Sequence, residues 1–202
     1  METVLVDTFI PKLRQLVNVP LAPLMNEVLV QAAQEFCRES GVVRYTRPIE
    51  AIESGSVLAV VGSSELNGAG SGSYIASEIM KITSVTPQET LILTKGDDYK
   101  LQGRDVVWFG VDIVSGVVHC SIEPTLNSTH VPQVLFDEYQ QAICYGAAHL
   151  LMLQPDSDWH NPQLAFEYRQ WFVEAMRSAK RFALENGDFQ SFHNPTRRRE
   201  FF

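Results

Sequence analysis

Apolar residues recur every three or four positions in the segment 132–186, and this period predicts a pair of helices. Asn161 before a proline is a typical helix start, and Asn186 followed by Gly187 predicts a left-handed helix end. The small residues at 146–148 allow another helix to approach closely. The first apolar stripe is Val134, Leu135, Tyr139, Ala142, Ile143, Gly146, Ala147, Leu150 and Leu151. The second is Ala165, Tyr168, Phe172, Ala175, Met176, Ala179 and Phe182.

A similar helical pattern lies near the N-terminus. Pro23 fits a first turn and Gly41 follows the last apolar position, so the sequence predicts a helix from Pro23 to Glu39. A short helix within 7–17 is compatible with Pro11 only if that proline occupies its first turn. The apolar stripe of the longer helix is Leu21, Leu24, Met25, Val28, Leu29, Ala32 and Phe36.

The hydrophobic period changes after Gly41. Residues 42–124 contain short runs of β-branched and aromatic residues, separated by Gly, Pro, Asn and Asp, which predict strands. The segment Ile113-Val114-Ser115-Gly116-Val117 resembles a hairpin turn between two of them, and Pro124 is expected to end the last strand. The predicted fold class is therefore α+β. A helical-bundle core, made of the N-terminal helix and the C-terminal helical pair, carries a β-rich insertion and an extended C-terminal arm. The expected ranges are 1–41 and 125–186 for the core, 42–124 for the insertion and 187–202 for the arm.

Composition narrows the possible classes of protein. The chain has 202 residues, 45% of them hydrophobic, and a net charge of −8. No apolar run is long enough to span a membrane, and no signal peptide is expected. The cysteines Cys37, Cys120 and Cys144 are far apart, which favours reduced thiols. The net negative charge argues against a protein that binds DNA phosphates through a basic surface. An acidic surface could still face DNA without binding it.

Several residues could suggest catalysis or ligand binding. Gly68, Gly70 and Gly72 follow a strand-like run, but they lack the spacing of a dinucleotide-binding turn or a P-loop, so a flexible loop is expected. His119 and Cys120 are adjacent in a predicted strand and therefore point to opposite faces, which makes a catalytic dyad unfavourable. We expect no enzyme activity and no cofactor.

A metal site is also not expected. Asp156, Asp158 and His160 lie in the connection between the two C-terminal helices, where polar and capping residues are needed without any metal. The sequence lacks the longer ligand series of a calcium-binding loop there.

The arm carries the one basic run of the chain. Contact with nucleic acid is one interpretation, docking into a groove of a protein partner is a second, and a frayed tail is a third. The aromatic residues around the run favour docking. The candidate binding residues are Phe192, Arg197, Arg198, Arg199, Phe201 and Phe202.

The order of these segments resembles the head-to-tail adaptor (connector) proteins of tailed bacteriophages over essentially the full length. The residues that carry the resemblance lie in three places. They are the segment Ala32–Ser40 with Phe36 and Cys37, the turn Asp158–Pro162 with Trp159, and the helical positions Ala142, Gly146, Leu150, Ala165, Tyr168 and Phe172.

The resemblance implies a structural virion protein that is assembled in the host cytoplasm. It would form a ring, typically twelvefold, beneath the portal protein, extend the channel for double-stranded DNA and provide the platform for tail or tail-completion proteins. The arm from about Gly187 would reach toward the portal, and the Gly68–Gly72 loop would line the channel or contact a neighbouring subunit. The alternatives are a small-molecule-binding module or enzyme built on the β insertion, and a cellular scaffold subunit.

Overall fold

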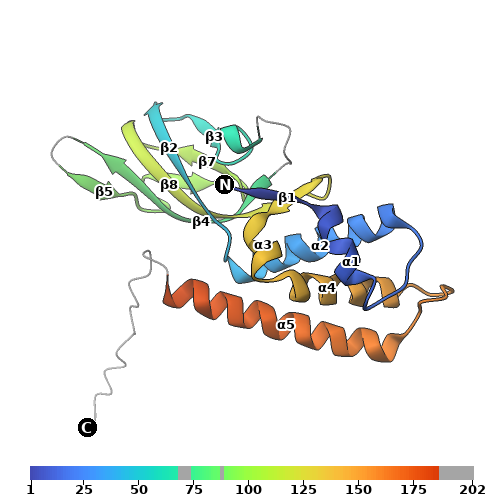
Figure 1. Cartoon of the computed structure of the whole chain (residues 1–202). Coiled ribbons are helices and arrows are strands. Elements are labelled where there is room, and N and C mark those ends of the chain that lie inside the picture. The colour runs from blue at the N-terminus through green and yellow to red at the C-terminus, as the bar shows by residue number, and fades with distance from the viewer. Residues whose placement is uncertain (68–73, 87–88, 187–202) are drawn as a thin grey trace, which may run out of the picture.

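The computed structural model describes residues 1–67, 74–86 and 89–186 of the chain. The helices are η1 (Val6–Phe9), α1 (Ile10–Leu13), α2 (Ala22–Ser40), η2 (Glu65–Asn67), α3 (Gln133–Asp137), α4 (Gln140–Met152) and α5 (Pro162–Glu185). The strands are β1 (Thr3–Leu5), β2 (Arg44–Ile52), β3 (Val57–Ala59), β4 (Tyr74–Val85), β5 (Thr90–Ile92), β6 (Tyr99–Leu101), β7 (Val106–Phe109), β8 (Ile113–Pro124) and β9 (His130–Pro132). The helices α1 to α4 gather at one end of the molecule with β1, and the two larger sheets lie at the other end (Figure 1).

The first long helix ends, and the second begins, as their sequences predict, whereas Asn186 at the end of α5 has φ of −104° and Gly187, on which the predicted left-handed end depends, lies outside the described residues. Gly41 caps α2 in the left-handed conformation, with φ of 62°, which glycine adopts without steric cost. The Asn161 side chain accepts a hydrogen bond from the backbone N–H of Leu164 at 3.1 Å, and Pro162 occupies the first position of α5. Pro11 likewise lies in the first turn of α1. These local predictions are confirmed.

Gly146 is the point where three helices meet. A Cβ atom at this position of α4 would lie 2.9 Å from two ring carbons of Phe172 on α5 and 3.0 Å from the Cβ of Ala32 on α2. The close approach expected from the small residues is therefore present, and it depends on the missing side chain.

The first helix of the predicted pair, whose apolar stripe runs from Val134 to Leu151, is divided in two. α3 ends at Asp137 and α4 begins at Gln140, because Tyr139 adopts φ of −123°, outside the helical region. The apolar period continues across this break, so the sequence pattern does not reveal it.

The strands form antiparallel sheets with β8 at the centre of the largest. Its strand order is β2-β8-β4-β5, with Pro48 opposite Val117 and Thr83 also opposite Val117 on the other side. A second sheet has the order β3-β7-β6, and β1 pairs with β9 beside the helices.

The expected helical-bundle core with a β-rich insertion is wrong. The protein is α+β with about 40% helix and 30% strand in several antiparallel sheets. One continuous cluster of buried side chains includes both helical and strand residues, so the sheet is part of the main core. The reason is that β8 packs directly on α2: the fully buried Glu123 of β8 receives hydrogen bonds of 2.8 and 2.6 Å from Arg38 of α2.

The predicted hairpin turn at Ile113–Val117 is also wrong, because β8 runs through this segment without interruption to Pro124. A Cβ atom on Gly116 would lie only 2.4 Å from the carbonyl oxygen of Thr83 on β4. This glycine is therefore needed for the close approach of two strands, which is the other common role of glycine within a strand pattern.

Asp105 connects the two ends of the segment between β3 and β4. Its Oδ1 accepts hydrogen bonds from the backbone N–H of Val61 at 2.8 Å and of Ala76 at 3.0 Å, and its Oδ2 accepts from Gly62 at 2.8 Å. A charged acceptor makes each of these bonds stronger than a neutral one. One carboxylate thus holds the beginning of β4 against the end of β3.

Candidate interaction surface

The three cysteine thiols are buried in the packed interior. Burial raises the pKa of Cys120 and of Cys144 to about 12, and it raises the pKa of Cys37 further. Cys120 donates to the carbonyl oxygen of Tyr45 at 3.6 Å, and Cys144 donates to that of Phe9 at 3.8 Å. A protonated, enclosed thiol is a poor nucleophile, so these side chains act as small packing residues.

His119 lies on the other face of β8 from Cys120, as adjacent strand positions require. Its Nδ1 atom is 3.2 Å from the hydroxyl of Thr46, and burial, followed by the charge of Lys81, lowers its pKa. In the described ranges, no group of three or more His, Cys, Asp or Glu side chains is arranged to hold a metal ion. The position of His119 in β8 and its contact with Thr46 account for this residue as part of the sheet.

Aromatic side chains gather instead where α5 lies against α4. The ring of Tyr145 on α4 stacks on Tyr168 with 5.3 Å between centroids, and it contacts Trp171 at 5.0 Å. Burial, and secondarily the charges of Tyr145 and Glu167, raise the pKa of the Tyr168 hydroxyl. Trp171 nevertheless keeps 48% of its surface exposed.

The same flank of α5 continues toward the end of the helix. Ala175, Ser178 and Phe182 follow Trp171 at steps of four, three and four residues, which places all four in one row along the helix. Phe182 is 55% exposed at the end of this row. We refer to Tyr145, Trp171, Ser178, Arg181 and Phe182 as the α5 surface.

An ion pair joins α5 to α2. Arg169 donates to both carboxylate oxygens of Glu35 on α2, at 2.9 and 2.6 Å, and its guanidinium lies 5.6 Å from the centroid of the Phe172 ring. The hydrogen bond to Glu35 is the main reason that the pKa of Arg169 is raised. Farther along, Arg177, Lys180 and Arg181 give the last turns of α5 a local positive charge in an acidic protein.

An exposed surface that combines Trp, Tyr, Phe and Arg is suited to protein–protein contact. These residue types supply large contact areas and are enriched where interfaces concentrate their binding energy. Because α5 is anchored to both α2 and α4, a partner would meet a surface that is already ordered.

The sequence predicted only part of this surface. Phe182 was expected in the buried stripe of its helix, and that expectation is wrong. Trp171 was not identified from the sequence as a surface residue. The available signal is that Trp171 and Phe182 lie eleven positions apart, about three helical turns, on the edge of the apolar stripe.

The other candidate residues lie outside the part of the chain that the structure describes. These are Gly68, Gly70 and Gly72 in the loop, and Phe192, Arg197, Arg198, Arg199, Phe201 and Phe202 in the arm.

Comparison with known proteins gave no assignment: no protein-family model matches the chain, and no curated protein matches it. Among the described residues, no helix is both long and apolar enough to cross a membrane.

Proposed function

We propose that this protein is a structural component of a phage virion, a head-to-tail adaptor. Copies of the chain form a ring, typically twelvefold, beneath the portal, extend the DNA channel and provide the platform for tail or tail-completion proteins. The observation that carries this proposal is the α5 surface, because a rigid helix with exposed aromatic and arginine side chains is suited to lasting protein contacts.

Two further features support the adaptor function. The order of a helix, a group of strands and a helical pair is the order that the resemblance requires, and it is present as α2, β2 to β8, and α4 with α5. The net charge of −8 suits a channel wall, because DNA phosphates are repelled by acidic side chains and the duplex slides without binding.

In this proposal the arm binds the portal through Phe192, Phe201, Phe202 and the three arginines 197–199. A single arm of this size binds weakly. A ring of arms on a matching ring gains affinity through effective concentration.

The test is to mix the purified protein with purified portal rings and to image the product by electron microscopy. We expect a second ring on the narrow end of the portal, with one adaptor for each portal subunit. A chain truncated after Asn186 keeps every contact described above, so it is expected to stay folded and to lose portal attachment. Circular dichroism and thermal unfolding of the truncated chain provide the folding control.

Two outcomes would contradict the proposal. If the full chain shows no association with portal rings, the adaptor function is wrong. If the truncated chain binds as well as the full chain, the arm does not mediate attachment.

A further inference from the structure

A pocket opens on the side of the helices opposite to α5. It has a volume of about 340 Å³ and lies between β1, the N-terminal half of α2 and the loop before β9. Leu5 and Leu126 form part of its wall and are 50% and 56% exposed, and Asp7 and Glu27 line it as well. We call these four residues, together with Asn26, the N-terminal pocket.

The N-terminal pocket is apolar and acidic. The Asn26 side chain donates a hydrogen bond to Asp7 and fixes the direction of that carboxylate. No lysine or arginine is among the described residues that line the pocket. An occupant should therefore combine an apolar group with a positive charge.

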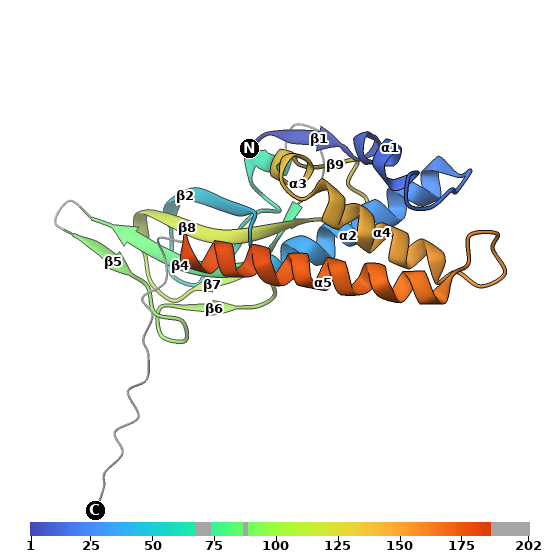
Figure 2. The same cartoon turned by 60° about the horizontal axis from the view of Figure 1, so that its bottom comes forward.

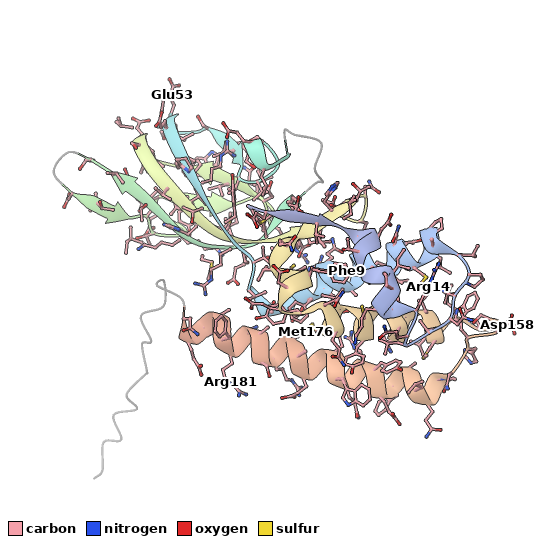
Figure 3. All side chains as sticks on the ribbon, in the orientation of Figure 1. Phe9, Arg14, Glu53, Asp158, Met176 and Arg181 are labelled. Atoms are coloured by element: carbon pink, nitrogen blue, oxygen red, sulfur yellow. The ribbon has the colours of Figure 1, made fainter. Side chains whose placement is uncertain are left out.

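The end of α5 has this combination. Phe182 is exposed, and the adjacent Arg181 extends from the helix away from the rest of the molecule (Figure 3). α5 lies on one side of α4 and the β1–β9 pair on the other, both in Figure 1 and in the turned view of Figure 2. The end of α5 and the pocket of one molecule therefore face different directions.

We propose that the N-terminal pocket receives Phe182 of a second copy of this chain, with Arg181 of that copy beside Asp7 and Glu27. The proposal rests on the ring formation suggested above and assigns the contact between neighbouring subunits. The ring of Phe182 leaves water for the apolar wall made by Leu5 and Leu126. The guanidinium of Arg181 supplies donors for the two carboxylates, which sets the register of the contact.

The position of the two surfaces determines the kind of assembly. A contact between two different surfaces of the same chain is heterologous, so each copy retains one unused surface for the next copy. Repetition gives a closed ring when the rotation between neighbours closes, and a filament when it does not. A symmetric dimer, in which the same surface meets itself, is not expected.

A charge exchange tests the contact. We expect Arg181→Glu to weaken self-association at least about tenfold, because it places a third carboxylate beside two others. Glu27→Arg should restore association when it is combined with Arg181→Glu. Lys95→Glu makes the same charge change on an exposed loop and should have no effect. Sedimentation of concentrated protein and imaging on portal rings are the two measurements, with thermal unfolding as the check that each variant is folded.

A cysteine pair tests the geometry independently. A Phe182→Cys chain mixed with a Leu126→Cys chain should form a disulfide-linked heterodimer under mild oxidation, whereas the Phe182→Cys chain alone should not. A chain with both substitutions should give a ladder of linked oligomers. The native thiols are buried and do not compete. Linkage of Phe182→Cys to itself would indicate a symmetric dimer and overturn the proposal.

The outcomes separate this contact from the adaptor function. A ring on the portal that survives Arg181→Glu and gives no heterodimer leaves the adaptor function intact and overturns the proposed contact. Self-association that follows the charge exchange, without portal binding, supports the contact and contradicts the adaptor function. Absence of self-association both in concentrated solution and on the portal overturns the contact.

Discussion

Replacing Gly146 by alanine is expected to destabilise the protein by about 1 kcal/mol. In an unobstructed helix this change would stabilise by about 1 kcal/mol, because alanine has the higher helix propensity. Here the added methyl group would lie 2.9 Å from the Phe172 ring and 3.0 Å from Ala32 Cβ. Overpacking of a core costs roughly 1–3 kcal/mol. Because both neighbours are buried and belong to different helices, we take a cost of about 2 kcal/mol, which exceeds the gain in propensity.

The free energy of unfolding can be measured by urea denaturation of wild type and variant. Phe172→Leu removes the ring that the methyl group meets, so Gly146→Ala should become neutral or stabilising in that background. The two substitutions should therefore be non-additive by about 1 kcal/mol or more. Ser178→Ala, on the exposed flank of α5, is the control and should not lower stability. If Gly146→Ala stabilises the wild-type chain, the three helices do not meet as closely as described.

Two further predictions concern buried polar groups. Arg38→Ala should lower the free energy of unfolding, measured by urea denaturation, by about 2–3 kcal/mol, because it leaves the carboxylate of the buried Glu123 poorly compensated. The control Arg177→Ala removes an exposed side chain and should lower it by less than about 0.5 kcal/mol. Equal losses for the two variants would refute this prediction. The pKa values of Cys120 and Cys144 are raised from 9.0 to about 12, so these thiols stay protonated in the native state above pH 9 while unfolded chains ionise. Their contribution to stability is therefore present below pH 9 and should be lost as pH rises from about 9 to 12. The loss should reach about 1.4 kcal/mol for each thiol and each pH unit. A variant with both Cys120→Ala and Cys144→Ala should lose less stability over this pH range.

The sequence predicted the elements whose signals are local. The left-handed Gly41, the cap at Asn161 and the proline in the first turn of α5 each act within one turn of their own helix. The hairpin turn predicted around Gly116 is wrong because a glycine is compatible both with a turn and with the close approach of two strands. The carbonyl group of Thr83, which lies against Gly116, is distant in sequence, so the local sequence does not distinguish the two.

The relation between the sheet and the helices could not be predicted for the same reason. The ion pair of Arg38 with Glu123 joins positions 85 residues apart, and only the folded chain reveals that β8 packs on α2. From the sequence alone, where this contact is not visible, the strands are interpreted as an insertion into a helical bundle.

The exposure of Phe182 follows from its position around the helix axis of α5. Ala179 and Ala183 are buried, whereas Phe182 lies on the same flank as Trp171 and is 55% exposed. The helix period places Phe182 at the edge of the apolar stripe, but it does not show how far the neighbouring elements extend over that edge.

The single carboxylate of Asp105 has a consequence for how this protein can vary. It fixes Gly62 and Ala76, so the separation of these two positions is set by the carboxylate and not by the number of residues between them. Loop-closure entropy grows only logarithmically, and a doubling of length costs about 0.6 kcal/mol. Residues inserted between Asn67 and Tyr74 should therefore cost little folding free energy, provided that Asp105 is kept. Such an insertion leaves the buried Tyr74 and the strand pairing of β4 unchanged.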